Sequence, residues 1–252
     1  AVASYNKAIA LNPDLTEAHN NLGNTLQGLG KLDEAVASYH KALDIKPDYS
    51  EAHYNLAFAF HSYGRRSEAL DHFKRGLELV RGGNPIDPRH QSFLFINKAK
   101  MNHDIEQFRY LASLGHETER FQSLVKIYKA VDSEIDWPSD DGVTIPLSDD
   151  HRQRLGDTYN RPIHLLEAPE VTGSTLCGSL DVEKITADYF SHSSGMTYFD
   201  DLLSPNVFAS LRRYLLGSTI WFDFSYKGEY LGAMLKDGLS CPLLFQIADD
   251  LR

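Results

Sequence analysis

The sequence predicts a mainly α protein: a helix–turn–helix solenoid, then a divergent helical pair, a long linker and a small, incomplete α+β unit. Three observations lead to this prediction. Residues 1–84 repeat with a period of 34. Apolar residues recur at helical spacing within residues 88–131. In residues 185–252, short β-branched and aromatic runs alternate with helical segments.

Small, aromatic and proline residues define the period in the first third of the chain. The registered sets are Ala1, Ala35 and Ala69; Tyr5, Tyr39 and Phe73; Ala8, Ala42 and Gly76; Pro13 and Pro47; His19 and His53; Leu22 and Leu56; Gly23 and Ala57; and Gly30 and Gly64. Arg81 stands where a third proline would fall and breaks the register.

The spacing inside each repeat predicts two helices joined by a turn. Leu22 and Leu26 are four residues apart and share one helix face. Gly30 suits the left-handed residue that ends a helix, and Pro47 ends the second helix. We therefore expect Tyr39 and its two equivalents to be buried in corresponding places.

This pattern resembles the tetratricopeptide repeat (TPR). The resemblance implies a curved stack whose concave face is lined by the first helix of each repeat. Side-chain amides there could pair with an extended peptide backbone, because they offer both a donor and an acceptor. The alternative is that these asparagines only link adjacent helices. The candidate peptide-binding residues are Asn20, Asn21, Asn24, Gln27, Tyr54, Asn55, Phe58 and His61.

The first residues fall at the start of a second helix, so the array opens in the middle of a repeat. A solenoid end normally carries a polar capping helix, and the segment from Ala1 to Tyr5 is not one. We expect an apolar patch at Val2 and Tyr5 that a neighbouring molecule or another segment covers, with self-association through the uncapped ends as one outcome.

Residues 85–135 are expected to continue the stack as a divergent helical pair, with helices over 88–114 and 117–131. His103 and Asp104 are adjacent and point to different faces of a helix, whereas His103 and Glu106 could share one face. A third metal ligand on that face is not evident, which favours a structural hydrogen-bonding role. Residues 136–184 are rich in turn-forming residues and predict an extended linker across the helices, with a short helix over 148–157.

Residues 185–252 predict an α+β unit. Ser204 and Pro205 suit the N-cap and first position of a helix. Short strands are expected at 196–199, 219–226 and 230–235, a turn at 227–228, and a last helix at 242–251. If strands are missing, Trp221, Phe222 and Phe224 should pack on neighbouring helices.

The run from Asp200 to Pro205, followed by aromatic strands, resembles the opening of a prolyl-4-hydroxylase-like Fe(II)/2-oxoglutarate oxygenase, as in bacterial repeat-fused members. The resemblance implies an iron site built from a His-x-Asp/Glu pair and a distant histidine. None of the 11 histidines has an acid two residues later. We therefore expect no catalytic residue, no metal site and no cofactor in this chain. Fe(II) and 2-oxoglutarate would enter only if the parent protein continues beyond Arg252.

Charge and cysteine content narrow the classes of partner. The chain has 25 basic and 35 acidic residues, a net charge of −10, so nucleic acid and anionic membrane surfaces are disfavoured. No apolar run approaches the roughly 20 residues of a membrane helix, and no signal peptide is legible. Cys177 and Cys241 form no CxxC pair and suit a reducing compartment, which favours a cytoplasmic location.

We expect a protein- or peptide-binding module of a larger protein, inactive as this chain. The first alternative is the N-terminal part of a 2-oxoglutarate/Fe(II)-dependent oxygenase whose catalytic residues lie beyond Arg252. Two further alternatives are a pure scaffold and an enzyme with a site of unfamiliar layout.

Overall fold

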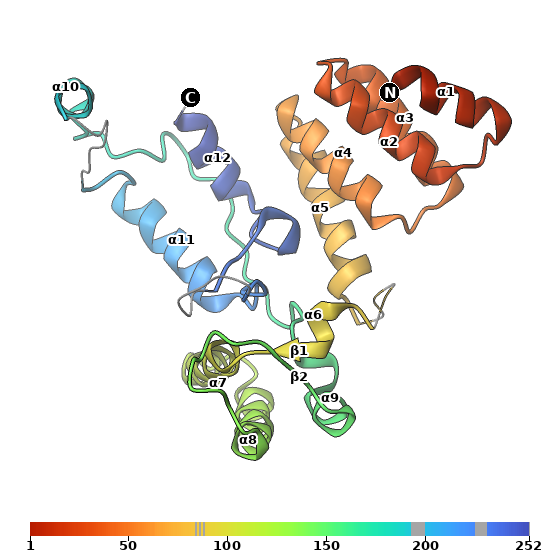
Figure 1. The fold of residues 1–252 in the computed structure, drawn as a ribbon. Coiled ribbons are helices and arrows are strands. Elements are labelled where there is room, and N and C mark those ends of the chain that lie inside the picture. The colour runs from red at the N-terminus through yellow and green to blue at the C-terminus, as the bar shows by residue number, and fades with distance from the viewer. Residues whose placement is uncertain (84, 86, 88, 193–199, 225–230, 252) are drawn as a thin grey trace. The chain divides into compact units, whose positions relative to one another are not determined.

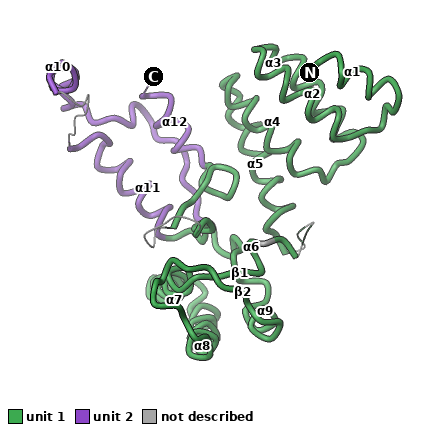
Figure 2. The backbone as a smooth tube through the Cα atoms, in the orientation of Figure 1, with its two compact units in different colours: residues 1–165, 217–240 green, residues 166–216, 241–252 purple. Residues whose placement is uncertain are grey.

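The computed structural model describes residues 1–83, 85, 87, 89–192, 200–224 and 231–251. The described chain is mainly helical, as predicted (Figure 1). It divides into two compact units, shown in Figure 2. Unit 1 comprises residues 1–165 and 217–240, and unit 2 comprises residues 166–216 and 241–252. The predicted 185–252 unit is thus divided, because residues 217–240 pack with the helices that precede the linker.

Residues 1–81 form successive helices with short turns between them. These are α1 (Val2–Leu11), α2 (Thr16–Gly28), α3 (Leu32–Ile45), α4 (Ser50–Ser62) and α5 (Arg66–Arg81). The pairs α2 with α3 and α4 with α5 pack most closely, as a helix–turn–helix repeat requires. Gly30 and Gly64 both have φ of +74°, which confirms the left-handed turn predicted at the end of each first helix.

The registered aromatic residues mark the core of this array. Tyr39 and Phe73 are 0% and 1% exposed, and a Cβ added at Gly23 would lie 2.4 Å from the Tyr39 ring. The absence of a side chain at Gly23 therefore makes room for the aromatic ring of the second helix. Tyr5 is only half-buried, so the prediction for it was wrong. The reason is that α1 packs chiefly against α2 and has no buried residue of its own.

The registered histidines and prolines are joined by a hydrogen bond in each repeat. The ring nitrogen Nε2 of His19 lies 2.9 Å from the Pro13 carbonyl oxygen, and Nε2 of His53 lies 3.1 Å from that of Pro47. Because a carbonyl can only accept, Nε2 carries the proton in both rings. In the second repeat, Nδ1 of His53 lies 2.9 Å from Nδ1 of His72 on α5. His72 must then donate this bond while His53 stays neutral.

The predicted helix over residues 88–114 is interrupted. A short helix α6 (Gln91–Leu94) leads into strand β1 (Phe95–Ile96), and α7 (Lys98–Ser113) begins after Asn97. The Asn97 side chain accepts a hydrogen bond from the Lys100 backbone N–H and caps α7. β1 pairs with strand β2 (Ile145–Pro146) in an antiparallel two-stranded sheet, with Ile96 opposite Ile145. The break therefore comes from a strand partner fifty residues downstream.

The second predicted helix is confirmed as α8 (Thr118–Glu134), which packs on α7. Residues 136–165 lie across this pair, as expected, and include helix α9 (Asp149–Leu155) and the 3₁₀ helix η1 (Gly156–Thr158), whereas residues 166–184 of the predicted linker belong to unit 2. Leu147, Leu155 and Tyr159 from this segment join the α7–α8 core.

Residues 217–240 return to unit 1 and end in the short helix η2 (Leu235–Asp237), which contacts α5. Within the described parts of the predicted strands 219–226 and 230–235, one antiparallel bridge pairs Asp223 with Gly232 and no longer ladder forms. The Thr219 backbone N–H instead donates to the His164 carbonyl. Residues 196–199 and the predicted turn at 227–228 lie outside the described residues.

The expected packing of the aromatic residues in this segment is confirmed for two of them. The Trp221 ring meets the His103 ring of α7 edge-on, with centroids 6.1 Å apart. Phe222 is buried beneath the guanidinium of Arg81 at the end of α5, which lies 4.5 Å from its ring centroid.

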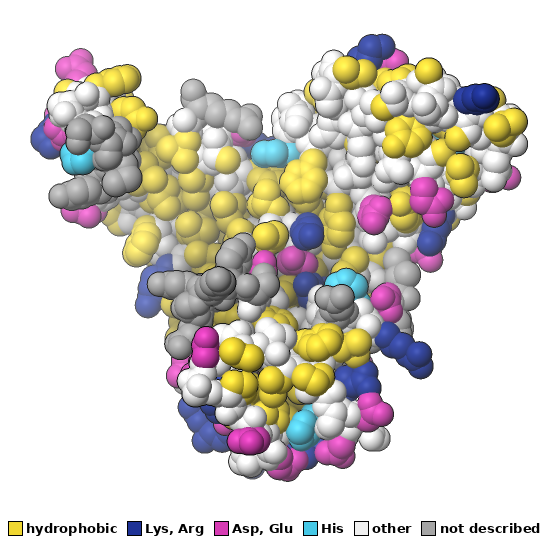
Figure 3. All heavy atoms as spheres, in the orientation of Figure 1, with side chains coloured by type: hydrophobic (Ala, Val, Ile, Leu, Met, Phe, Trp, Pro, Cys, Tyr) yellow, Lys and Arg dark blue, Asp and Glu magenta, His cyan; other side chains and the backbone are white. Residues whose placement is uncertain are grey.

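Unit 2 contains helices α10 (Val182–Ser191), α11 (Pro205–Gly217) and α12 (Pro242–Asp250). The sequence predicts the last two and misses α10, which has no buried residue. The Gln246 side chain bonds the Val171 backbone at both N–H and C=O, which ties α12 to the preceding segment. Figure 3 shows hydrophobic side chains gathered over α11 and α12 on the face in view. None of the described helices has the length and apolarity needed to cross a membrane.

We predict that acid weakens the array through His72. Burial, together with the neighbouring His53 and His40, lowers the pKa of His72 to about 4 in the folded chain. In an unfolded chain that pKa is about 6.5. The unfolded state therefore takes up the proton first as pH falls, so the free energy of unfolding should decrease from about pH 6.5 down to about pH 4.

Urea titrations across this pH range measure the effect. His72→Ser, which copies the equivalent residue Ser38, should flatten the decrease, whereas His192→Ser, an exposed histidine in unit 2, should not. If the free energy of unfolding depends on pH equally in the His72 variant and in the parent chain, protonation of His72 does not govern acid stability.

Candidate functional site

The first helices of the two complete repeats expose matching stripes. On α2 the stripe is Glu17, Asn21, Asn24 and Gly28; on α4 it is Glu51, Asn55, Phe58 and Ser62. In both stripes the residues follow at i, i+4, i+7 and i+11, so they share one helix face. The remaining candidates lie on the flanks of these stripes. We refer to this surface as the first-helix face.

The structure brings Asn20 and Asn55 together. Asn20 is 2% exposed, and its Oδ1 accepts a hydrogen bond of 2.9 Å from Nδ2 of Asn55. Asn20 therefore links α2 to α4, which is the structural alternative considered for these asparagines. Asn55 uses one amide N–H in this link and remains half-buried. Asn21 has no such role, although it occupies the equivalent position in the first repeat.

Asn24 and Gln27 are held by the partner helix. The Tyr39 hydroxyl lies 2.8 Å from Oδ1 of Asn24 and 2.8 Å from Oε1 of Gln27. Because these two oxygens face the hydroxyl, the NH₂ groups of both amides remain available as donors. Burial raises the pKa of Tyr39 to about 12, so its hydroxyl keeps its proton at neutral pH.

The three remaining candidates differ in accessibility. Tyr54 is half-buried, and its ring lies so close to Gly76 that a Cβ there would be 2.4 Å from it. Burial, and then the Asp237 carboxylate, raises the pKa of Tyr54 above its ordinary value. Phe58 is 38% exposed and rests edge-on against the Phe73 ring at 5.0 Å. His61 is half-buried at the end of α4.

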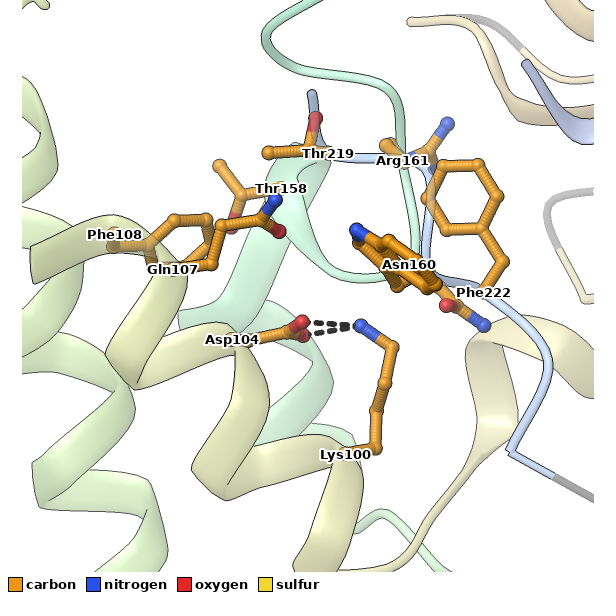
Figure 4. Close-up of a pocket in the computed structure, with 10 residues that line it drawn as sticks. Lys100, Asp104, Gln107, Phe108, Thr158, Asn160, Arg161, Thr219 and Phe222 are labelled. Atoms are coloured by element: carbon orange, nitrogen blue, oxygen red, sulfur yellow. Dashed lines mark hydrogen bonds and ion pairs between the residues drawn. The ribbon is translucent and has the colours of Figure 1, made fainter. Parts of the chain in front are cut away.

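A buried ion pair lies beside the small cavity of Figure 4. Lys100 Nζ is 2.5 Å from both carboxylate oxygens of Asp104, and the two side chains are 3% and 7% exposed. His103 Nδ1 also approaches Asp104 at 3.3 Å. Burial disfavours the carboxylate, but Lys100 and His103 outweigh it and hold the pKa of Asp104 below its ordinary value. Burial lowers the pKa of Lys100 despite this partner.

Arg81, the residue that breaks the repeat, makes the second buried ion pair. Its Nε donates to Asp237 Oδ1 at 2.8 Å, and a second nitrogen donates to the Asn160 carbonyl at 3.3 Å. Gln107 on α7 donates to the Ser218 carbonyl at 2.7 Å. These contacts join α5, α7 and residues 217–240, so the Arg81–Asp237 pair has a structural role, whereas the Lys100–Asp104 pair lies within α7. Two features of the sequence point to these pairs: Arg81 stands at a position that is proline in the preceding repeats, and Asp104 directly follows His103.

Among the described residues, one group has its ligand atoms close enough to hold a metal ion: Glu134, Asp150 and His151. The Arg154 guanidinium already bonds both carboxylates, at 2.5 Å and 3.2 Å. The Arg154 guanidinium therefore already neutralises the two carboxylates that would bind a metal ion.

Comparison with known proteins identifies the array. The family model described as TPR repeat matches residues 1–30 and 28–64, so this part of the chain consists of TPR repeats. A search of curated proteins found no match.

Solved structures are similar over part of the chain. A MamA structure is 34% identical over 31% of this chain and 45% of that chain, with a TM-score of 0.30. A second MamA structure is 38% identical over 31% and 46%, with the same TM-score. YrrB, described as a TPR protein with an unusual peptide-binding site, is 22% identical over 52% and 58%, with a TM-score of 0.30. The chain spans about half of the length of the MamA chains that it matches, between 44% and 55%.

Replacing the two equivalent asparagines should separate a structural role from a binding role. Asn55→Ala leaves the buried Asn20 oxygen without its donor and should cost about 1–3 kcal/mol of unfolding free energy. Asn21→Ala should stay within about 0.5 kcal/mol of the parent chain. Chemical denaturation measures both values. Equal costs for the two variants would contradict the assignment, and a double-mutant cycle with Asn20→Ala isolates the pair's coupling.

Removing one partner of the Lys100–Asp104 pair should lower the free energy of unfolding far more than replacing both partners. Lys100→Met leaves a buried carboxylate without its cation and should destabilise the chain by about 3–5 kcal/mol. Lys100→Met combined with Asp104→Asn should recover most of that loss. Denaturation of the three variants tests this expectation, and a double variant as unstable as the single one would refute it.

Proposed function

We propose that this chain is a protein-interaction module whose first-helix face binds an extended peptide segment of a partner protein. The TPR repeats of residues 1–64 support a role in protein binding. The observation that carries the proposal is the pair of matching stripes on α2 and α4, which are half-buried at the registered amides Asn21 and Asn55 and exposed at their other positions, Phe58 included.

Fixed amides favour binding because little side-chain freedom remains to be lost. Tyr39 orients Asn24 and Gln27, and the bond to Asn20 orients Asn55. Such side chains can donate to peptide carbonyls regardless of the peptide's sequence. Phe58 adds an apolar contact for a side chain of the ligand, because its ring is partly exposed and packs edge-on against the buried Phe73 ring. Within this proposal Asn21 and Phe58 contribute affinity, while Asn20 and Tyr54 hold the helices together.

The oxygenase alternative stays a prediction about a longer chain. The ion pairs of Lys100 with Asp104 and of Arg81 with Asp237 are accounted for by packing. We therefore propose no catalytic residue and no cofactor for this chain.

A peptide array tests the function directly. The full chain is applied to immobilised random twelve-residue peptides, and selected sequences are measured in solution by fluorescence anisotropy. Asn21→Ala should weaken binding by about 1 kcal/mol, roughly fivefold, for one lost hydrogen bond. Phe58→Ala should weaken it further. The matched control is Asn6→Ala, which removes an exposed asparagine on α1, outside the first-helix face.

Two results would refute the proposal. The first is an array on which no peptide binds above background. The second is a set of confirmed ligands whose affinity is the same for Asn21→Ala, Phe58→Ala and the parent chain.

A further inference from the structure

The edge of the first-helix face carries acidic side chains at the repeat period. Asp14 and Asp48 precede α2 and α4, and Glu17 and Glu51 lie in their first turns; each pair is 34 residues apart. All four residues are exposed. The repeat therefore places carboxylates, as well as amides, in matching positions on successive first helices.

Carboxylates from both repeats act on one hydroxyl group at this edge. Tyr49 immediately precedes α4, and its hydroxyl donates to Glu51 Oε2 at 2.7 Å. Burial raises the pKa of Tyr49, and the charges of Glu51 and then Glu17 raise it further. Glu17 on α2 and Glu51 on α4 therefore contribute to one negative region.

Cationic side chains are scarce around this region. Neither α2 nor α4 contains lysine or arginine. The basic residues that follow these helices, Lys31 and Arg65, are paired with Glu34 and Glu68 at 2.8 Å and 2.6 Å. Lys46, which lies 5.6 Å from the Tyr49 ring centroid, is the basic residue next to the acidic edge in sequence. The Arg75 charge also reaches His53 on α4, so the cationic groups near these four carboxylates include Lys46 and Arg75.

We propose that the first-helix face selects cationic peptides: an extended segment with lysine or arginine at the acidic edge and an apolar side chain at Phe58. This inference rests on the proposed function and adds the chemical class of the ligand. Charge complementarity gives discrimination against the wrong partner more than raw affinity, because like charges brought together are penalised. An acidic peptide would place its carboxylates against Glu17 and Glu51.

First-turn glutamates also stabilise a helix through its dipole, whether or not a ligand binds. That role predicts a change in stability when the glutamates are replaced, but no preference between basic and acidic peptides. The ligand's charge is therefore the variable that separates the two explanations.

The probes are three peptides of ten residues with acetylated and amidated ends. They share one leucine and one phenylalanine and differ in carrying two lysines and one arginine, three glutamines, or three glutamates. Binding to the full chain is measured by fluorescence anisotropy at low and high salt. The basic peptide should bind at least about tenfold more tightly than the acidic one at low salt, and salt should narrow the gap.

Two double variants sharpen the test. Glu17→Gln with Glu51→Gln should reduce the preference, and Glu17→Lys with Glu51→Lys should reverse it. The control for total charge is Glu106→Lys with Glu119→Lys, which makes the same change at exposed positions of α7 and α8 and should keep the preference for the basic peptide.

The outcomes distinguish the two proposals. Array-selected peptides that bind while the basic probe has no advantage over the acidic one would overturn the charge preference and leave the binding function standing. A control variant that loses the preference as fully as the glutamate variants would also overturn it, because net charge would then explain the effect. No binding by the probes or on the array would overturn both.

Discussion

The buried guanidinium of Arg81 is the contact on which the arrangement of unit 1 depends. It donates to Asp237 and to the Asn160 carbonyl, and it covers the Phe222 ring. A buried arginine needs such partners, because an unpaired charge in the interior costs several kcal/mol. In the preceding repeat the equivalent residue is Pro47, which ends a helix and leaves the stack free to continue. At Arg81 the repeat register ends, and the guanidinium there pairs with Asp237 of residues 217–240.

The Arg81–Asp237 contact also lies close to Tyr54, one of the candidate residues of the first-helix face. Asp237 lies close enough to act on the Tyr54 hydroxyl, and Gly238 packs near Ile220 and Leu77. Tyr54 is thereby fixed at the end of the face and is less accessible than Phe58. The accessible part of the face is consequently short, consisting of the two stripes of α2 and α4. A short face suits a short segment of a partner protein, with affinity concentrated at a few side chains.

Under the proposed function, each set of amides combines a structural role with a binding role. Asn20 and Asn55 pair with each other, while Asn24 and Gln27 bond the Tyr39 hydroxyl through their oxygens and do not use their NH₂ groups in that contact. The two roles support each other, since an amide held by one bond presents its remaining donor in a fixed direction. The His53 ring also uses both nitrogens: Nε2 donates to the Pro47 carbonyl, and Nδ1 accepts a hydrogen bond from His72.

The sequence by itself determined the repeat, its period, the helix pairs and the helices near the C-terminus, because each depends on contacts between residues close in sequence. It also predicted a set of candidate residues on the first helices, of which Asn20 is buried in the structure. Tertiary structure decided which asparagine is buried, since Asn20 and Asn21 differ only in their direction around α2. It also decided that Phe95 and Ile96 form a strand, and that Arg81 pairs with Asp237, 156 residues away. Neither partner is visible from local periodicity, because long-range pairing leaves no regular spacing in the sequence.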